Sequence, residues 1–209
     1  MTREVTPTRV LLVRHGQSTW NAQGRWQGWA DSPLSEIGEE QARAAAKHLP
    51  EVEAVVSSDL VRARRTAELI CEGRDLPPAE IYRGLRERGV GEFEGMTNPE
   101  IAERFPHLIG SDGSRPLDIP GAEPIPSVIA RVVAALTRVA RSHEGRAVLA
   151  VSHGGVIRAL ERHLGIEPAH VSNLGGRWIE VDARGGLALG ERVCLFDRDE
   201  APVTIPRQL

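Results

Sequence analysis

Short apolar runs that end abruptly in polar residues recur along this chain. The run 10–13 is followed by Arg14-His15, the run 54–56 by Ser57-Ser58-Asp59, and the run 147–151 by Ser152-His153. Runs of this length are too short for helices and predict strands that are buried on both faces of a sheet. If the strands are parallel, their carboxyl ends bring these polar residues to one edge of the sheet, where α/β proteins bind ligands.

Other segments carry apolar residues at helical spacing or are rich in alanine. They predict helices at about 36–49, 60–72, 127–142 and 154–164, with a short helix at about 100–105. Ser35 is the expected N-cap of the first helix, and Gly73 is expected to end the second. The runs 178–181 and 187–189 flank Gly185-Gly186, which predicts a β-hairpin.

Strands that alternate with helices predict an α/β fold, here a three-layer α/β/α sandwich with a mostly parallel central sheet. A chain of 209 residues has the size of one domain, so we expect a single domain over 1–209. Five prolines and three glycines lie between 106 and 126. This composition predicts a lid-like excursion from the domain at about 96–126.

The composition is typical of a globular protein, with 41% hydrophobic and 26% charged residues. The net charge of -3 gives no general attraction to nucleic acid or to an anionic membrane. Two cysteines without a CxxC pattern, and no apolar run of membrane-spanning length, predict a cytoplasmic protein. The predicted hairpin would leave a sheet edge that could support a homodimer.

The residues at the strand ends fit chemistry on a phosphate group. Arg14 and Arg62 could bind its oxygens, because a guanidinium is always charged and can contact two oxygens at once. Of His15 and His153, one could attack phosphorus while the other helps to bind the oxygens. Glu87 could supply the proton that a leaving alkoxide needs. Neighbouring residues compete for two of these roles, Arg64 and Arg65 with Arg62, and Glu92 and Glu94 with Glu87.

Several blocks of this sequence, in order, resemble the histidine phosphatase superfamily, in the branch that includes phosphoglycerate mutases and related phosphatases. The matching blocks are Arg14-His15-Gly16-Gln17-Ser18-Thr19-Trp20-Asn21, Gln27-Gly28, Ser57-Ser58-Asp59-Leu60-Val61-Arg62-Ala63, Leu85-Arg86-Glu87 and Val151-Ser152-His153-Gly154-Gly155. The blocks span residues 9 to about 165, which is most of the chain. Together they are far more specific than Arg-His-Gly alone.

The resemblance implies a role for each of these residues. It makes His15 the nucleophile that becomes phosphorylated, and Glu87 the proton donor and later the base that activates water. It assigns Arg14, Arg62 and His153 to binding of the phosphoryl group. Substrate-binding positions carried over from the family are Asn21, Gln27, Gly28 and Gly154. It implies a small phosphorylated metabolite as substrate and neither a metal nor a cofactor.

Three functions remain open at this stage. A phosphatase would pass the phosphoryl group to water, and the segment 91–97 is similar to that of broad-specificity phosphatases. A phosphoglycerate mutase would return the group to substrate, and such enzymes typically carry a longer insertion after the acid loop. A non-catalytic sensor of phosphorylated ligands is the third. Pro124 stands where the related phosphatases carry Ser after Pro-Gly-Gly-Glu, which is a departure within the predicted lid.

Overall fold

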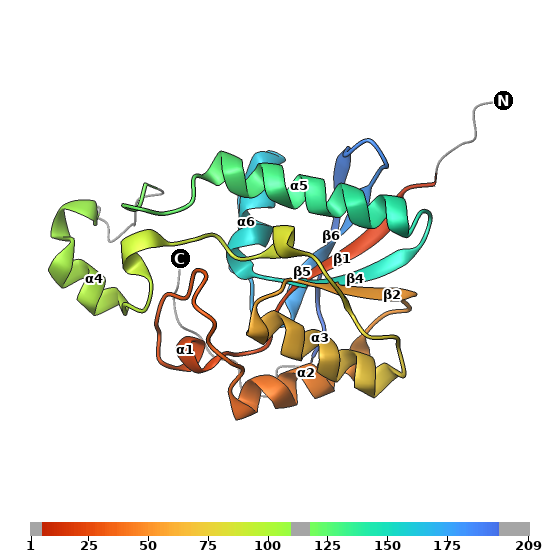
Figure 1. Ribbon diagram of the computed structural model, residues 1–209, viewed down its shortest axis with the longest axis horizontal. Helices are drawn as coiled ribbons and strands as arrows, with labels where there is room; N and C mark the ends of the chain where they lie inside the picture. The colour runs from red at the N-terminus through yellow and green to blue at the C-terminus, as the bar shows by residue number, and fades with distance from the viewer. Residues whose placement is uncertain (1–5, 110–117, 197–209) are drawn as a thin grey trace.

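A central β-sheet forms the middle layer of the computed structural model, which describes residues 6–109 and 118–196. Within these residues the sheet has six strands in the order β3-β2-β4-β1-β5-β6. The strands β3, β2, β4 and β1 are parallel, β5 runs antiparallel to β1, and β6 pairs antiparallel with β5. Figure 1 shows helices above and below this sheet, so the predicted three-layer sandwich with a mostly parallel sheet is confirmed.

The elements follow one another in the alternating order that the sequence predicts. In chain order they are β1 (Thr8–Arg14), α1 (Thr19–Ala22), α2 (Glu36–His48), β2 (Ala54–Ser57), α3 (Val61–Arg74), β3 (Glu80–Ile81), η1 (Arg83–Leu85), η2 (Gly91–Phe93), α4 (Asn98–Arg104), η3 (Pro106–Leu108), α5 (Ile125–Ser142), β4 (Ala147–Ser152), α6 (Gly154–His163), β5 (Gly175–Val181) and β6 (Leu187–Cys194). The predicted C-terminal hairpin is the antiparallel pair β5 and β6.

Strand β1 is the centre of the core because it lies between β4 and β5 and is covered on both faces. Successive side chains of a strand point to opposite faces. Val10 and Leu12 therefore pack into the apolar layer beneath α5 and α6. Leu11 and Val13 pack into the layer formed with α2 and α3. All four side chains are fully buried, which fixes the place where the strand delivers Arg14.

The helix ends lie within two residues of the predicted ones, and Gly73 is not the end of its helix. Ser35 caps α2 as predicted, with its side chain accepting a hydrogen bond from the amide of Gly38. Helix α3 continues through Gly73 to Arg74 and ends at Asp75, which adopts a left-handed conformation with φ 50°. The glycine serves packing instead, since a Cβ there would lie 2.7 Å from the Cβ of Ala46 on α2. Gly73 thus permits a close approach of the two helices.

The segment predicted as a lid contains regular structure of its own. Helix α4 begins with a capping box between Thr97 and Glu100. Phe93, Ile101, Phe105 and Ile119 belong to a small apolar cluster beside the two main layers of the core. Figure 1 shows α4 at the periphery of the molecule, away from the sheet. The part of the predicted excursion at 110–117 lies outside the described residues.

Candidate active site

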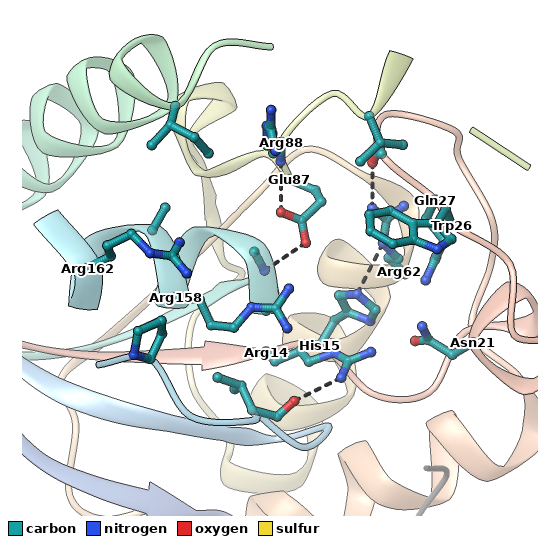
Figure 2. Close-up of a pocket in the computed structure, with 18 of the residues that line it drawn as sticks. Arg14, His15, Asn21, Trp26, Gln27, Arg62, Glu87, Arg88, Arg158 and Arg162 are labelled. Atoms are coloured by element: carbon teal, nitrogen blue, oxygen red, sulfur yellow. Dashed lines mark hydrogen bonds between the residues drawn. The ribbon is translucent and has the colours of Figure 1, made fainter. Parts of the chain in front are cut away.

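The carboxyl ends of β1 and β4 open into a pocket with a volume of about 370 Å³. The β1 end brings His15 there, and the neighbouring β4 end brings His153 close to it, as the pattern of buried runs predicts. The pocket is lined by Arg14, His15, Asn21, Trp26, Gln27, Gly28, Arg62, Glu87, Arg88, Val90, Ile125, Gly154, Gly155, Arg158, Ala159, Arg162, Glu167, Pro168 and Val171. Figure 2 shows the polar side chains converging on His15.

His15 is held with one ring nitrogen available to the pocket. Its Nδ1 lies 2.6 Å from the carbonyl oxygen of Gly16, and its Nε2 accepts a hydrogen bond of 3.2 Å from Nε of Arg62. These partners favour the tautomer with the proton on Nδ1. Burial lowers the pKa of His15 well below 6.5, and the charges of Arg62 and Arg14 lower it further. A neutral imidazole that carries its proton on Nδ1 and its lone pair on Nε2 is the form that can attack phosphorus.

Two arginines flank this imidazole. Arg62, fully buried on the first turn of α3, donates to the carbonyl oxygens of Gly28 at 2.9 Å and Ala30 at 2.8 Å. Arg14 donates to the carbonyl oxygen of Val171 at 2.9 Å. Desolvation in the interior is the main cause that lowers the pKa of each guanidinium to about 10. Both therefore remain cationic at neutral pH and present a positive charge to an anion in the pocket.

His153 lies directly behind the nucleophile candidate. The rings of His15 and His153 are 5.1 Å apart between centroids, in an edge-on arrangement. Nε2 of His153 is 2.9 Å from Oγ of Ser58, the residue that follows β2. Its Nδ1 is buried and has no hydrogen-bond partner in the part of the chain that the structure describes. Burial lowers the pKa of His153 well below 6.5, with Arg62 as the next cause.

Glu87 faces His15 from the loop after η1, across the mouth of the pocket (Figure 2). Its two carboxyl oxygens accept hydrogen bonds from backbone amides, Oε1 from Arg88 at 2.8 Å and Oε2 from Gly155 at 3.0 Å. The second amide belongs to the first turn of α6. The competing acid Glu94 has a different task, because its Oε2 accepts from the amides of Trp29 and Ala30. Of the acids that the sequence left open, Glu87 is the one in the pocket.

The remaining predicted residues also line the pocket. Asn21 is buried in the short helix α1, and its Nδ2 has no hydrogen-bond partner among the described residues. Gln27 accepts from Oγ of Ser18. Gly28 has φ 51°, and its carbonyl oxygen accepts from Arg62. Gly154 begins α6 beside Arg14, where a Cβ would lie 3.4 Å from the Cδ of that arginine.

Three pocket arginines escaped the sequence analysis. Arg158 and Arg162 project from α6, and Arg88 lies next to Glu87 (Figure 2). Their i, i+4 spacing on α6 was the available signal for the first two, but it equally fits an ordinary solvent-exposed helix face. The arginines that competed with Arg62 lie elsewhere, since Arg64 and Arg65 form ion pairs with Glu68 on the helix surface.

Two further observations concern the described residues as a whole. Within 6–109 and 118–196, no group of three or more His, Cys, Asp and Glu side chains is arranged to hold a metal ion. None of the helices in these ranges combines the length and apolar character needed to cross a membrane.

Comparison with protein families matches residues 10–182 to the histidine phosphatase superfamily (branch 1). The match covers most of the chain and includes every residue predicted for the site. The chain therefore belongs to this superfamily, and the family predicted from the sequence is confirmed.

Relatives within the superfamily include both phosphatases and mutases. A metal-independent phosphoserine phosphatase of Arabidopsis thaliana is 41% identical over 159 residues, which cover 73% of this chain and 67% of that protein. A 2,3-bisphosphoglycerate-dependent phosphoglycerate mutase of Methylobacterium radiotolerans is 35% identical over 176 residues, covering 79% of this chain and 83% of that protein. A solved mycobacterial glucosyl-3-phosphoglycerate phosphatase, in complex with VO3, matches with a TM-score of 0.70 at 28% identity, over 90% of this chain and 99% of that chain.

Proposed function

We propose that this protein is a phosphatase that hydrolyses a small-molecule phosphomonoester through a phosphohistidine intermediate on His15. The observation that carries the proposal is the environment of His15: a neutral imidazole whose Nε2 faces a pocket between two guanidinium groups. The phosphatases among its relatives support the reaction class.

The first half-reaction transfers the phosphoryl group to the enzyme. Nε2 of His15 attacks phosphorus, and the bond from phosphorus to the alkoxide oxygen breaks. Arg14 and Arg62 neutralise the negative charge on the transferred oxygens, which is the main requirement of phosphoryl transfer. The Nδ2 group of Asn21, a donor with no described partner, supplies a further hydrogen bond to those oxygens.

Glu87 completes both half-reactions. In its protonated form it donates a proton to the leaving alkoxide, so that an alcohol departs. The resulting carboxylate then takes a proton from water while that water attacks the phosphohistidine, which releases inorganic phosphate and frees His15. The amides of Arg88 and Gly155 hold the carboxyl group in place during both steps.

The test begins with trapping of the intermediate. Brief exposure to a phosphomonoester, followed by an alkaline quench, should give protein that carries one phosphoryl group on His15 and loses it in acid. His15→Ala should remove both this label and the release of phosphate from p-nitrophenyl phosphate, with an unchanged circular dichroism spectrum. Unaltered hydrolysis by His15→Ala would refute the mechanism. Binding of phosphate esters without any turnover would identify a sensor instead.

A mutase is the second candidate, because mutases are also among the relatives. The two activities differ in the fate of the phosphoryl group. Incubation with 3-phosphoglycerate, with and without 2,3-bisphosphoglycerate, followed by assays for inorganic phosphate and for 2-phosphoglycerate, separates them. The phosphatase proposal expects net release of phosphate. Interconversion of the two phosphoglycerates without such release would establish the mutase.

A further inference from the structure

We propose that Asn173 and Thr66 are positioning residues for the nucleophile. They hold the peptide unit that joins His15 to Gly16, and through that unit they orient the imidazole of His15. Both side chains lie outside the described pocket lining, so they act through His15 and not on the substrate. This inference rests on the proposed function, since it takes His15 to be the residue that receives the phosphoryl group.

The orientation of the His15 ring depends on the residue that follows it. Nδ1 of the ring lies 2.6 Å from the carbonyl oxygen of Gly16, and this contact selects the tautomer that leaves the lone pair on Nε2. Position 16 requires glycine, because a Cβ there would lie 2.5 Å from the carbonyl oxygen of Gly38. Glycine, however, restricts its own backbone less than any other residue. The carbonyl of Gly16 therefore keeps its direction when neighbouring groups fix the peptide unit before it.

Two buried side chains fix this peptide unit at both ends. Nδ2 of Asn173 donates to the carbonyl oxygen of His15 at 2.9 Å, and the amide of Gly16 donates to Oγ1 of Thr66 at 3.1 Å. A trans peptide directs its C=O and N–H groups in opposite directions, so the two side chains hold it from opposite sides. Asn173 is 3% exposed and Thr66 is 0% exposed. Loss of either side-chain group would leave a buried backbone group short of a partner, which is costly.

Thr66 ties the peptide unit to the helix that supplies Arg62. Its hydroxyl proton is donated to the carbonyl oxygen of Arg62 at 2.7 Å, which leaves an oxygen lone pair to accept from Gly16. Arg62 lies one turn earlier on α3, and its Nε donates to Nε2 of His15 (Figure 2). Helix α3 thus acts on both nitrogens of the imidazole, on Nε2 through Arg62 and on Nδ1 through the peptide unit.

A strained turn brings Asn173 to His15. The next residue, Leu174, has φ 55°, a left-handed conformation that the Cβ of a leucine disfavours, and its side chain is fully buried. In this conformation the amide of Leu174 donates to the carbonyl oxygen of Arg14 at 3.0 Å, while Asn173 reaches the carbonyl oxygen of His15. The carbonyl oxygen of Val171 accepts from the Arg14 guanidinium. This segment therefore holds Arg14 and His15 together, and backbone strain of this kind collects at functional sites.

Substitution of Thr66 separates positioning from folding. Thr66→Val removes the hydroxyl at nearly constant volume, whereas Thr66→Ser keeps it. In pre-steady-state experiments with p-nitrophenyl phosphate, the burst amplitude counts correctly folded sites, and the rate constant of phosphoenzyme formation reports the alignment of His15. Thr66→Val should lower this rate constant between about 10- and 100-fold. Thr66→Ser should stay within about threefold of the wild type.

Thr137→Val is the matched control for Thr66→Val. The hydroxyl of Thr137 on α5 also donates to a carbonyl oxygen four residues earlier, that of Val133, at the same 2.7 Å. Thr137→Val should leave the rate constant of phosphoenzyme formation unchanged. A lower burst amplitude with an unchanged rate constant in Thr66→Val would show a purely structural role and would overturn the proposal.

Asn173→Asp tests the second donor through its pH dependence. A protonated carboxyl group can donate to the carbonyl oxygen of His15 as the amide does, whereas a carboxylate can only accept and repels that oxygen. The rate constant of this variant, divided by that of the wild type at the same pH, should be at least about tenfold higher at pH 5 than at pH 8. Asn173→Leu, which has no donor, should be impaired about equally at both pH values.

Asn98→Asp is the matched control for this pH dependence. Oδ1 of Asn98 accepts from Nε1 of Trp26, a role that a carboxylate retains, so the corresponding ratio should not change with pH. Wild-type rate constants in both Thr66→Val and Asn173→Leu would overturn the proposal, as would a ratio for Asn173→Asp that does not change with pH. Absence of a phosphoryl group on His15 in the wild type would instead overturn the proposed function. The two failures are distinguishable, because the first is seen in an enzyme that still forms phosphohistidine.

Discussion

The pocket has two walls that are built in opposite ways. The inner wall, formed by Arg14, His15 and Arg62 with His153 directly behind it, comes from strand ends and from the start of α3. His15, Arg62 and His153 are at most 3% exposed. The outer wall, formed by Arg88, Arg158 and Arg162, comes from a loop and from α6, and Arg162 is exposed. Rigid, desolvated groups suit the chemistry that every substrate shares, and more exposed groups on a helix face suit discrimination between substrates.

Glu87 lies between the two walls. Its replacement should lower kcat more than the replacement of Gly155 or Arg131. Glu87→Gln keeps the shape of the side chain but cannot donate a carboxylic proton. We expect kcat to fall by about 10³-fold for an alkyl phosphate, within the range for loss of general acid–base catalysis. The loss should be much smaller for transfer from p-nitrophenyl phosphate, whose leaving group needs little protonation. Pre-steady-state rates of alcohol or nitrophenol release would measure this contrast. Equal losses for both esters would remove Glu87 from the role of acid.

Gly155→Ala should move the carboxyl group of Glu87 without removing it. The variant therefore tests how far activity depends on the position of that group. A Cβ at this residue would collide with Oε1 of Glu87, while the glycine amide holds the other carboxyl oxygen. The flexible side chain of Glu87 must then shift. We expect kcat for alkyl phosphates to fall between about 10- and 100-fold, with the urea midpoint of unfolding nearly unchanged. Gly165→Ala is a useful control for a helix-end glycine, since a Cβ there would meet open space, although its φ of 77° adds local strain.

The two walls also differ in how well the sequence predicts them. The buried run 10–13 followed by Arg14-His15 predicts the inner wall, because α/β proteins bind ligands at the carboxyl ends of buried parallel strands. Arg158 and Arg162 give no such sign. On a helix they resemble a solvated face, and only the packing of α6 against the sheet decides that this face borders a pocket. Gly73 failed as a helix stop for the same reason, since its contact with α2 depends on the tertiary structure.

Arg131 on α5 supports the acid from outside the pocket, and its replacement should have a moderate effect. Its guanidinium donates to the carbonyl oxygens of Gly84, Arg86 and Glu87 at 2.7–2.9 Å and pairs with both oxygens of Glu123. Lysine cannot reproduce this planar set of donors. We expect Arg131→Lys to lower kcat for alkyl phosphates by about tenfold.

A double-mutant cycle shows whether Arg131 is a positioning residue or only a structural one. If it acts through Glu87, adding Arg131→Lys to Glu87→Gln should cost little further activity. Full additivity of the two losses would mean that Arg131 stabilises the fold without positioning the acid. Arg138→Lys, elsewhere on α5 and over the ring of Tyr82, is the matched control and should leave the contrast between leaving groups unchanged.

The smallest expected effect is on the free energy of unfolding, whose pH dependence reflects His15 and His153. His15 and His153 have pKa values well below 6.5 in the folded protein, because burial disfavours their charged forms. Below pH 6.5 the unfolded chain therefore binds protons that the folded chain does not, so stability falls as the pH decreases toward the folded pKa values. Each histidine contributes at most about 1.4 kcal/mol per pH unit to this slope.

Urea unfolding between pH 7 and pH 5 measures this contribution. His15→Asn should reduce the dependence of the unfolding free energy on pH by up to one histidine's share, and His153→Asn should do the same. Arg162→Gln, in the outer wall, should leave the slope unchanged because it removes no titrating histidine. If both histidine variants keep the wild-type slope, the two rings titrate in the folded protein as they do in the unfolded chain. The inner wall would then not supply the neutral nucleophile on which the phosphohistidine mechanism depends.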